Sequence, residues 1–218
     1  MVSLVLALAL APPVLKVACV GDSITFGYGL PEPVRAKSSY PAALGFRLGG
    51  GYEVENFGHT GATLMNLDWL PPIMKTDEYK KSLEFQPNIV LIMGGTNDGA
   101  PRNWEHASQL PTDLDKMVKS YHDLPSHPKI YILIPPRLLP KAEGGLIGND
   151  TQCDNVNRLL PPILRTFATK QGLPVIDARQ VITTRDCYTP DGIHLTEKGC
   201  GKLANQVAFV LLKKKKQA

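Results

Sequence analysis

Four short segments of this 218-residue chain carry the residue types that acyl transfer requires. They are Gly21-Asp22-Ser23, the stretch Asn-Phe-Gly-His-Thr-Gly-Ala-Thr at 56–63, Gly-Gly-Thr-Asn-Asp at 94–98, and Asp-Gly-Ile-His at 191–194. A serine hydroxyl is a weak nucleophile until a neighbouring base accepts its proton. The sequence offers a serine, a histidine and several hydrogen-bond donors, which together predict the cleavage of an ester through a serine nucleophile.

Each predicted role has a chemical reason. We expect Ser23 to be the nucleophile, His194 the base, and Asp191 the group that orients the imidazole and stabilises its charged form. The backbone amides of Ser23 and Gly61 and the side-chain amide of Asn97 are the predicted oxyanion-hole donors. Taken alone, Gly-Asp-Ser is typical of a turn and a helix cap.

The elements that position these segments follow from the hydrophobic pattern. Short apolar runs alternate with helix-like segments, and two of the runs are continuous, as in strands covered on both faces. The predicted strands are Leu15–Val20, Tyr52–Asn56, Ile89–Met93, Ile130–Ile134 and Val175–Ile176. The predicted helices are Tyr40–Leu48, Asp77–Leu83, Leu110–Asp123, Asn155–Lys170 and Thr196–Leu212. This order predicts an α/β fold, a three-layer α/β/α sandwich with about five parallel strands.

The ends of parallel strands explain how segments so far apart could meet. In such sheets ligands bind outside the carboxyl ends of the strands. Three of the four segments directly follow a predicted strand, and the fourth precedes the last predicted helix. We therefore expect all four at one edge of the sheet.

Length and charge predict one domain over residues 15–212. Residues 1–14 form an apolar extension or a signal-like segment, and residues 213–218 a basic tail. The net charge of +4 comes largely from the four lysines at 213–216, so the body is near neutral and no nucleic-acid surface is expected. The apolar run at 4–11 is too short for a stable membrane span. It slightly favours a secreted or endomembrane-lumen location over the cytoplasm.

These four blocks, in this order, resemble the GDSL or SGNH hydrolase family, with isoleucine at position 24 where the family name has leucine. The resemblance implies a flavodoxin-like α/β/α fold and cleavage of esters or thioesters without metal or cofactor. It assigns Ser23, Gly61, Asn97, Asp191 and His194 the roles given above. The Gly-x-Ser-x-Gly pattern of ordinary α/β-hydrolases is absent from the sequence.

The resemblance also suggests a substrate. Lys-Ser-Ser-Tyr-Pro at 37–41, Asn-Phe-Gly at 56–58 and Asn103-Trp104 look like bacterial carbohydrate O-acetylesterases, such as sialate and xylan acetylesterases. The expected substrate is a small-molecule or carbohydrate ester, most simply an acetyl ester. A lysophospholipase or acyl-thioesterase on the same fold stays an alternative, as does a non-catalytic sugar- or lipid-binding domain.

Three further residues are candidate substrate contacts, each with a plainer alternative. His59 lies inside the second block, and its alternative is a solvated loop histidine. Trp104 could stack against a sugar or simply pack in the core. Arg137 follows the fourth predicted strand and could meet the substrate there.

The four cysteines form no CxxC pair, and the other histidines lack metal-like spacing, so no metal site is expected. Cys19 lies inside the first predicted strand and should be a buried free thiol. Cys187 and Cys200 flank the Asp191–His194 segment. In an oxidising compartment a disulfide between them would clamp that loop.

Overall fold

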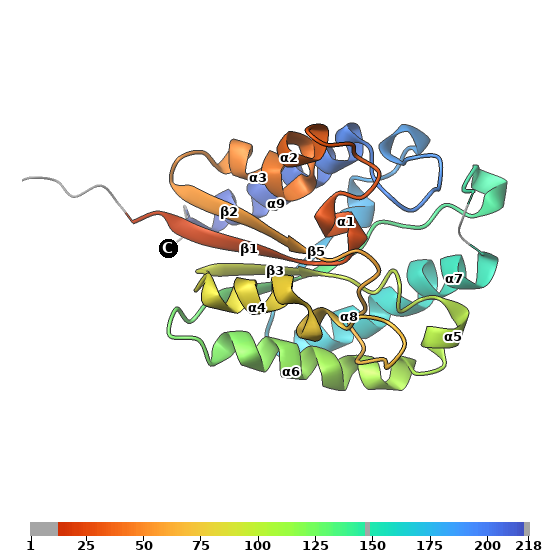
Figure 1. Ribbon diagram of the computed structural model, residues 1–218, viewed down its shortest axis with the longest axis horizontal. Helices are drawn as coiled ribbons and strands as arrows, with labels where there is room; N and C mark the ends of the chain where they lie inside the picture. Colours follow the sequence, from red (N-terminus) through yellow and green to blue (C-terminus); the bar gives the residue numbers. More distant parts are fainter. Residues whose placement is uncertain (1–12, 147–148, 216–218) are drawn as a thin grey trace, which may run out of the picture.

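The computed structural model describes residues 13–146 and 149–215, and these residues build a layered α/β structure around one parallel sheet (Figure 1). The sheet has five strands in the order β2-β1-β3-β4-β5. The strands are β1 (Leu15–Gly21), β2 (Tyr52–Gly58), β3 (Ile89–Met93), β4 (Lys129–Ile134) and β5 (Val175–Asp177). All neighbouring pairs are parallel, so the carboxyl ends of the strands meet at one edge. This confirms the predicted fold class.

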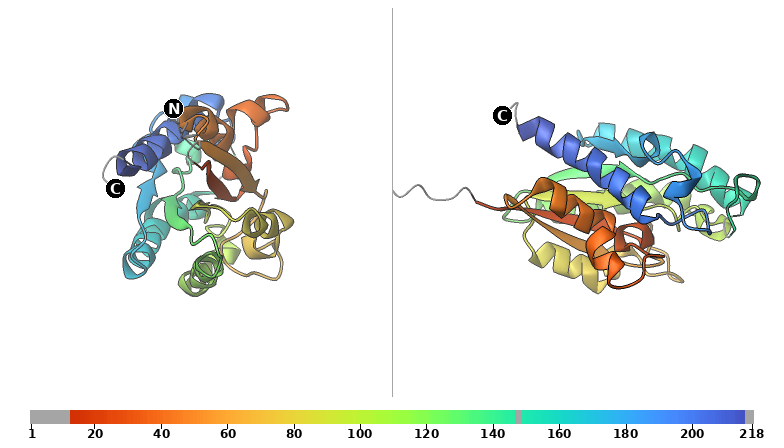
Figure 2. Two further views of the ribbon diagram at one scale, coloured as in Figure 1. Left: turned by 90° about the vertical axis from the view of Figure 1, so that its left-hand side faces the viewer. Right: turned by 90° about the horizontal axis from the view of Figure 1, so that it is seen from above.

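Helices cover both faces of the sheet (Figures 1 and 2). Helices α4, α6 and α8 pack on one face, while α3 and α9 pack on the other. The longer helices are α3 (Tyr40–Leu48), α4 (Asp77–Glu84), α6 (Leu110–His122), α8 (Leu160–Lys170) and α9 (Glu197–Lys215). The short ones are α1 (Ser23–Phe26), α2 (Val34–Ser38), α5 (Pro101–Trp104) and α7 (Asp150–Asp154).

Strand β3 illustrates why the central strands are continuously apolar. Successive side chains of a strand point to opposite faces, so Val90 and Ile92 pack under α4, α6 and α8, while Leu91 and Met93 pack under α3 and α9. All four are essentially inaccessible to solvent. Burying a leucine or isoleucine side chain stabilises the fold by about 1.5–3 kcal/mol.

The helix boundaries differ from the predicted ones by more than one residue in two places. The helix expected at 155–170 begins with α7 at residue 150 and passes through one π-helical turn at Asn155–Leu159 before α8. Pro161 and Pro162 lack the N–H groups that a continuous α-helix would use there, which accounts for the interrupted ladder. Helix α9 continues three residues beyond Leu212, into the basic tail.

The cysteines are all free thiols, and the hypothesis of a disulfide between Cys187 and Cys200 is therefore wrong for this structure. The sulfur of Cys187 instead lies 3.4 Å from the Thr184 hydroxyl. The loop that leads to Asp191 and His194 is held by Arg185, whose guanidinium donates to the carbonyls of Tyr188 and Thr189, both at 3.0 Å.

Cys19 is a buried free thiol, as predicted, and its burial raises the pKa of the thiol to about 12. The predicted apolar extension lies outside the described residues except for Pro13 and Val14. In the part of the chain that is described, no helix combines the length and the apolar character needed to cross a bilayer.

Candidate active site

Ser23 sits at the carboxyl end of β1, where the chain turns sharply into α1. Asp22 caps this short helix, since its side chain accepts a hydrogen bond from the Ile24 amide at 2.9 Å. Gly21 allows β1 and β3 to approach, because a Cβ there would lie 2.1 Å from the carbonyl oxygen of Met93. The turn therefore holds Ser23 as the first residue of α1, with its side chain at the edge of the sheet.

A series of hydrogen bonds joins Ser23, His194 and Asp191. The Nε2 atom of His194 lies 2.8 Å from the Ser23 hydroxyl oxygen, and its Nδ1 atom lies 2.6 Å from a carboxylate oxygen of Asp191. A carboxylate only accepts hydrogen bonds, so Nδ1 carries the hydrogen and Nε2 is left as the acceptor for the serine proton. The structure thus brings together three residues, of which Ser23 and His194 are 171 positions apart in the sequence.

Asp191 is held in place from both of its oxygens. One oxygen faces His194, and the other accepts from the Thr189 hydroxyl at 2.7 Å, the Ile193 amide at 2.8 Å and the His194 amide at 2.9 Å. Partial burial raises the pKa of Asp191, but these hydrogen bonds outweigh it and hold that pKa well below the usual range. The carboxylate is consequently charged at neutral pH and fixed in orientation.

The predicted oxyanion donors face the same space. Asn97 follows β3, and its side-chain nitrogen donates to the Ala62 carbonyl at 2.8 Å, which leaves its second N–H available. Gly61 has φ +77°, and a Cβ there would meet nothing within 4 Å, so its bare backbone borders open space. Ser23 is the first residue of α1, and the first N–H groups of a helix have no partner within it.

Two buried carboxyl groups support these loops from behind. Asp98 accepts from the amides of Leu64 at 3.0 Å and Met65 at 2.8 Å, which ties the segment after β3 to the segment after β2. Burial raises the pKa of Asp98 to about 7 and that of Asp22 to about 6. Through their hydrogen bonds both carboxyl groups hold the turns that carry Ser23 and Asn97.

The site opens into a cavity of about 260 Å³. All five predicted catalytic and oxyanion residues line it. The other lining residues are Tyr28, Thr60, Thr96, Gln152 and Ile193. The arrangement supplies a nucleophile, an oriented base and donors for an oxyanion around one space, which is what an acyl-transfer site needs.

The three candidate substrate contacts do not line this cavity. His59 is paired through Nδ1 with Glu78 at 2.9 Å, and Trp104 is packed against the hydrophobic core beneath the sheet. The Arg137 guanidinium is paired with Glu143 at 3.0 Å. Each of these side chains contacts another part of the protein, and the predicted order of strands gives no information on such contacts.

Sequence reasoning missed several residues that the fold places at the site. The Tyr28 ring packs on the His194 imidazole with their centroids 4.6 Å apart, and Tyr28 could have been suspected from its place five residues after the serine. Gln152 comes from α7 and donates to the Thr96 carbonyl at 3.0 Å. No signal in the sequence pointed to it. In the described ranges, no group of three or more His, Cys, Asp or Glu residues is arranged to hold a metal ion.

A family model described as the GDSL-like Lipase/Acylhydrolase family matches residues 19–201. The chain belongs to this family. The match spans all four segments, and it confirms the family that the sequence suggested.

Among curated proteins, an acetylxylan esterase from Xylanibacter ruminicola is 35% identical over 215 residues. The alignment covers 90% of this chain but 43% of that relative, so the chain spans less than half the length of the curated relative. Among solved structures, the native aryl esterase of M. smegmatis has a TM-score of 0.74 at 21% identity, covering 92% of this chain and 99% of that one. A carbohydrate acetylesterase family member from Sinorhizobium meliloti has a TM-score of 0.70, also at 21% identity, covering 92% and 98%. At these identities the two structures establish that the fold is shared.

Proposed function

We propose that this chain is a serine esterase that cleaves acetyl esters carried by a carbohydrate. The observation that carries the proposal is the hydrogen-bonded series from Ser23 through His194 to Asp191, which opens into a cavity bordered by Gly61 and Asn97. Membership of the GDSL-like lipase/acylhydrolase family supports the same reaction class.

In the first half of the reaction, Nε2 of His194 accepts the Ser23 proton while the serine oxygen forms a bond to the ester carbonyl carbon. The electron pair of the carbonyl moves onto its oxygen, which the Ser23 and Gly61 amides and the Asn97 side chain stabilise by hydrogen bonds. The intermediate then collapses, the bond to the alcohol oxygen breaks, and the leaving alcohol takes the proton from His194. The products of this half are a free hydroxyl on the carbohydrate and an acetyl group on Ser23.

In the second half, water replaces the alcohol. His194 accepts a proton from water as its oxygen attacks the acetyl carbon, and the same donors hold the second oxyanion. Collapse returns the proton to Ser23 and releases acetate. Each charge that develops is met by Asp191 or by a donor of this chain, so the proposed mechanism uses no metal ion.

The preference for a small acyl group rests on two supports. The cavity of about 260 Å³ lies just below the range of about 300–1,000 Å³ usual for drug-sized ligands, which suits an acetyl group better than a long chain. The relative from Xylanibacter ruminicola is named an acetylxylan esterase. The competing function on the same site is a lysophospholipase or acyl-thioesterase, and the competing function of another class is a sugar- or lipid-binding domain without catalysis.

One set of assays separates these functions. The wild-type protein and Ser23→Ala are given nitrophenyl esters from acetate to laurate, acetyl-thioester substrates and acetylated xylan, with and without a chelator. We expect fastest turnover of the acetate ester, release of acetate from xylan, no effect of the chelator and loss of all activity in Ser23→Ala. A preference for long acyl chains or for thioesters would favour the lysophospholipase or acyl-thioesterase over the acetylesterase. Equally slow hydrolysis by wild type and Ser23→Ala would favour the non-catalytic binding domain.

A further inference from the structure

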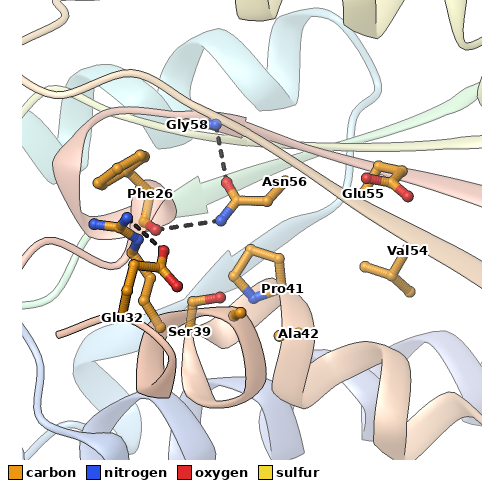
Figure 3. Close-up of a pocket in the computed structure, with 11 residues that line it drawn as sticks. Phe26, Glu32, Ser39, Pro41, Ala42, Val54, Glu55, Asn56 and Gly58 are labelled. Carbon is orange, nitrogen blue, oxygen red and sulfur yellow. Dashed lines mark hydrogen bonds and ion pairs between the residues drawn. The ribbon is translucent and has the colours of Figure 1, made fainter. Parts of the chain in front are cut away.

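A second cavity, of about 330 Å³, lies against the outer edge of the sheet (Figure 3). Its walls come from the end of α1, from α2, from the start of α3 and from β2, which is an edge strand. The volume falls within the range of about 300–1,000 Å³ typical of ligand sites. This edge cavity contains none of the residues of the Ser23 cavity.

The edge cavity joins apolar surfaces with polar groups. Phe26, Pro41 and Val54 contribute apolar surface, and the polar side chains include those of Glu32, Arg35 and Ser39. A pyranose ring has the matching character, because it presents apolar C–H faces and a rim of hydroxyl groups. Carboxylate and hydroxyl oxygens accept hydrogen bonds from such hydroxyls.

Ser39 is the most informative of these residues. It is 2% exposed and stands at the N-cap of α3, yet its side chain makes no capping hydrogen bond. Within the described part of the chain its hydroxyl has no hydrogen-bond partner, and it points toward the space between Glu32 and Pro41 (Figure 3). The Ser39 oxygen is not among the unpaired side-chain atoms that are sealed from solvent, so it offers a donor and an acceptor to a molecule bound in the cavity.

The charges indicate a neutral ligand. The Arg35 guanidinium is already paired with Glu32 at 2.5 Å and stacked over the Phe26 ring at 4.2 Å from its centroid. The Glu55 side chain points to the opposite face of β2 and adds no charge to the cavity (Figure 3). The one guanidinium of the edge cavity is thus neutralised by the carboxylate beside it, and a cavity without net charge suits a neutral ligand.

The edge cavity adjoins the Ser23 cavity through two stretches of chain. Gly58 lines the edge cavity and Thr60 lines the Ser23 cavity, and two residues of chain span at most about 7 Å. Phe26 and Ser23 stand at opposite ends of the one-turn helix α1 and line one cavity each. Asn56 braces this wall, since its side chain donates to the Phe26 carbonyl at 3.3 Å and accepts from the Gly58 amide at 3.0 Å.

We propose that the edge cavity is an accessory subsite for a polysaccharide substrate. It binds an unesterified sugar unit of the polysaccharide while an acetyl group on another unit enters the Ser23 cavity. This inference rests on the proposed function, because it takes the substrate to be an acetylated polysaccharide. It adds a specificity determinant outside the reaction centre, which would favour oligosaccharides over small esters.

The binding test uses xylotetraose, which carries no ester and therefore probes the subsite without turnover. Amide resonances are followed by two-dimensional NMR in wild type, Ser39→Ala and Ser38→Ala. Ser38 is the matched control, since its hydroxyl donates to Glu197 and it does not line the edge cavity. We expect the Ser39 and Gly58 signals to shift, with affinity roughly three- to tenfold weaker in Ser39→Ala and unchanged in Ser38→Ala. Absence of shifts at this edge, or equal effects of the two variants, would overturn the proposal.

A kinetic test then separates the subsite from the proposed function. Ala36 is exposed on the rim of the edge cavity, so Ala36→Trp should fill it without disturbing the core. We expect Ala36→Trp and Ser39→Ala to raise KM for acetylated xylotetraose several-fold while kcat/KM for nitrophenyl acetate stays at the wild-type value. Unchanged kinetics on both substrates, or equal losses on both, would overturn the subsite. If wild type fails to cleave nitrophenyl acetate at all, the proposed function fails, whereas the binding result with xylotetraose still decides the subsite.

Discussion

Replacing Asp191 by asparagine tests the proposed role of this residue with little change in shape. One carboxylate oxygen of Asp191 accepts from the Thr189 hydroxyl and from the amides of Ile193 and His194. These donors would keep the amide oxygen of Asn in that place, so the amide nitrogen must face Nδ1 of His194. Because that nitrogen donates, Nδ1 becomes the acceptor and the imidazole hydrogen moves to Nε2, where it points at Ser23.

The expected loss follows from that reversal. An imidazole with its hydrogen on Nε2 cannot accept the serine proton, and the same exchange in a serine protease lowers kcat by about 10⁴. At about 1.36 kcal/mol for each factor of ten, the barrier rises by roughly 5 kcal/mol. KM should change little, since the substrate cavity keeps its shape and Asp191 acts through His194.

The assay is hydrolysis of nitrophenyl acetate at neutral pH, with thermal unfolding to show that the variant is folded. Asp186→Asn is the matched control, because Asp186 lies in the preceding turn and binds Lys198 rather than the histidine. The control should retain wild-type kcat. If folded Asp191→Asn loses less than about tenfold in kcat, the carboxylate does not set the imidazole tautomer.

Three further results are expected. Asn97→Ala should lower kcat by about 10²–10³ through loss of one oxyanion donor, and a kcat within a factor of a few of wild type would remove Asn97 from that role. Gly21→Ala should markedly reduce the free energy of unfolding, measured in urea, because its Cβ would meet the Met93 carbonyl at 2.1 Å, and an unchanged midpoint would contradict this contact. Asp98 and Asp22 have folded-state pKa values of about 7 and about 6, above the unfolded value near 3.9. Because the folded protein holds these protons more tightly, their contribution to the free energy of unfolding falls as the pH rises from about 4 to about 7. Urea unfolding across this range should give a shallower decline in Asp98→Asn, and an identical decline would mean that Asp98 does not titrate there.

Much of the fold could be predicted because the sequences of the strands show which of their faces are buried. The run Ile89–Met93 is apolar throughout since both of its faces are covered, and its place before Asn97 fixed that residue at the strand end. The same reasoning grouped Ser23, Gly61 and His194 at one edge. The short helices α1, α2 and α5 escaped prediction, because four or five residues are too few for a helical period to be visible.

Other features depended on contacts that a single sequence does not encode. Gln152 lies at the site because α7 packs near the end of β3, where its side chain donates to the Thr96 carbonyl. Arg137 does not line the site, and its guanidinium donates to Glu143 instead. Asn103 looked like part of a substrate motif, yet it is buried, donating to the Asn97 carbonyl and accepting from the Trp69 indole at 2.7 Å. Each outcome is decided by which partner lies within reach after folding.

In the proposed mechanism Ser23 attacks the ester and carries the acyl group. The acyl-enzyme can be trapped by mixing wild type with nitrophenyl acetate, quenching in acid within the first turnovers, and mapping the peptides by mass spectrometry. We expect one acetyl group, located on the peptide that contains Ser23, and none in Ser23→Ala. An acetyl group on another residue, or acetate release by Ser23→Ala at the wild-type rate, would contradict this mechanism.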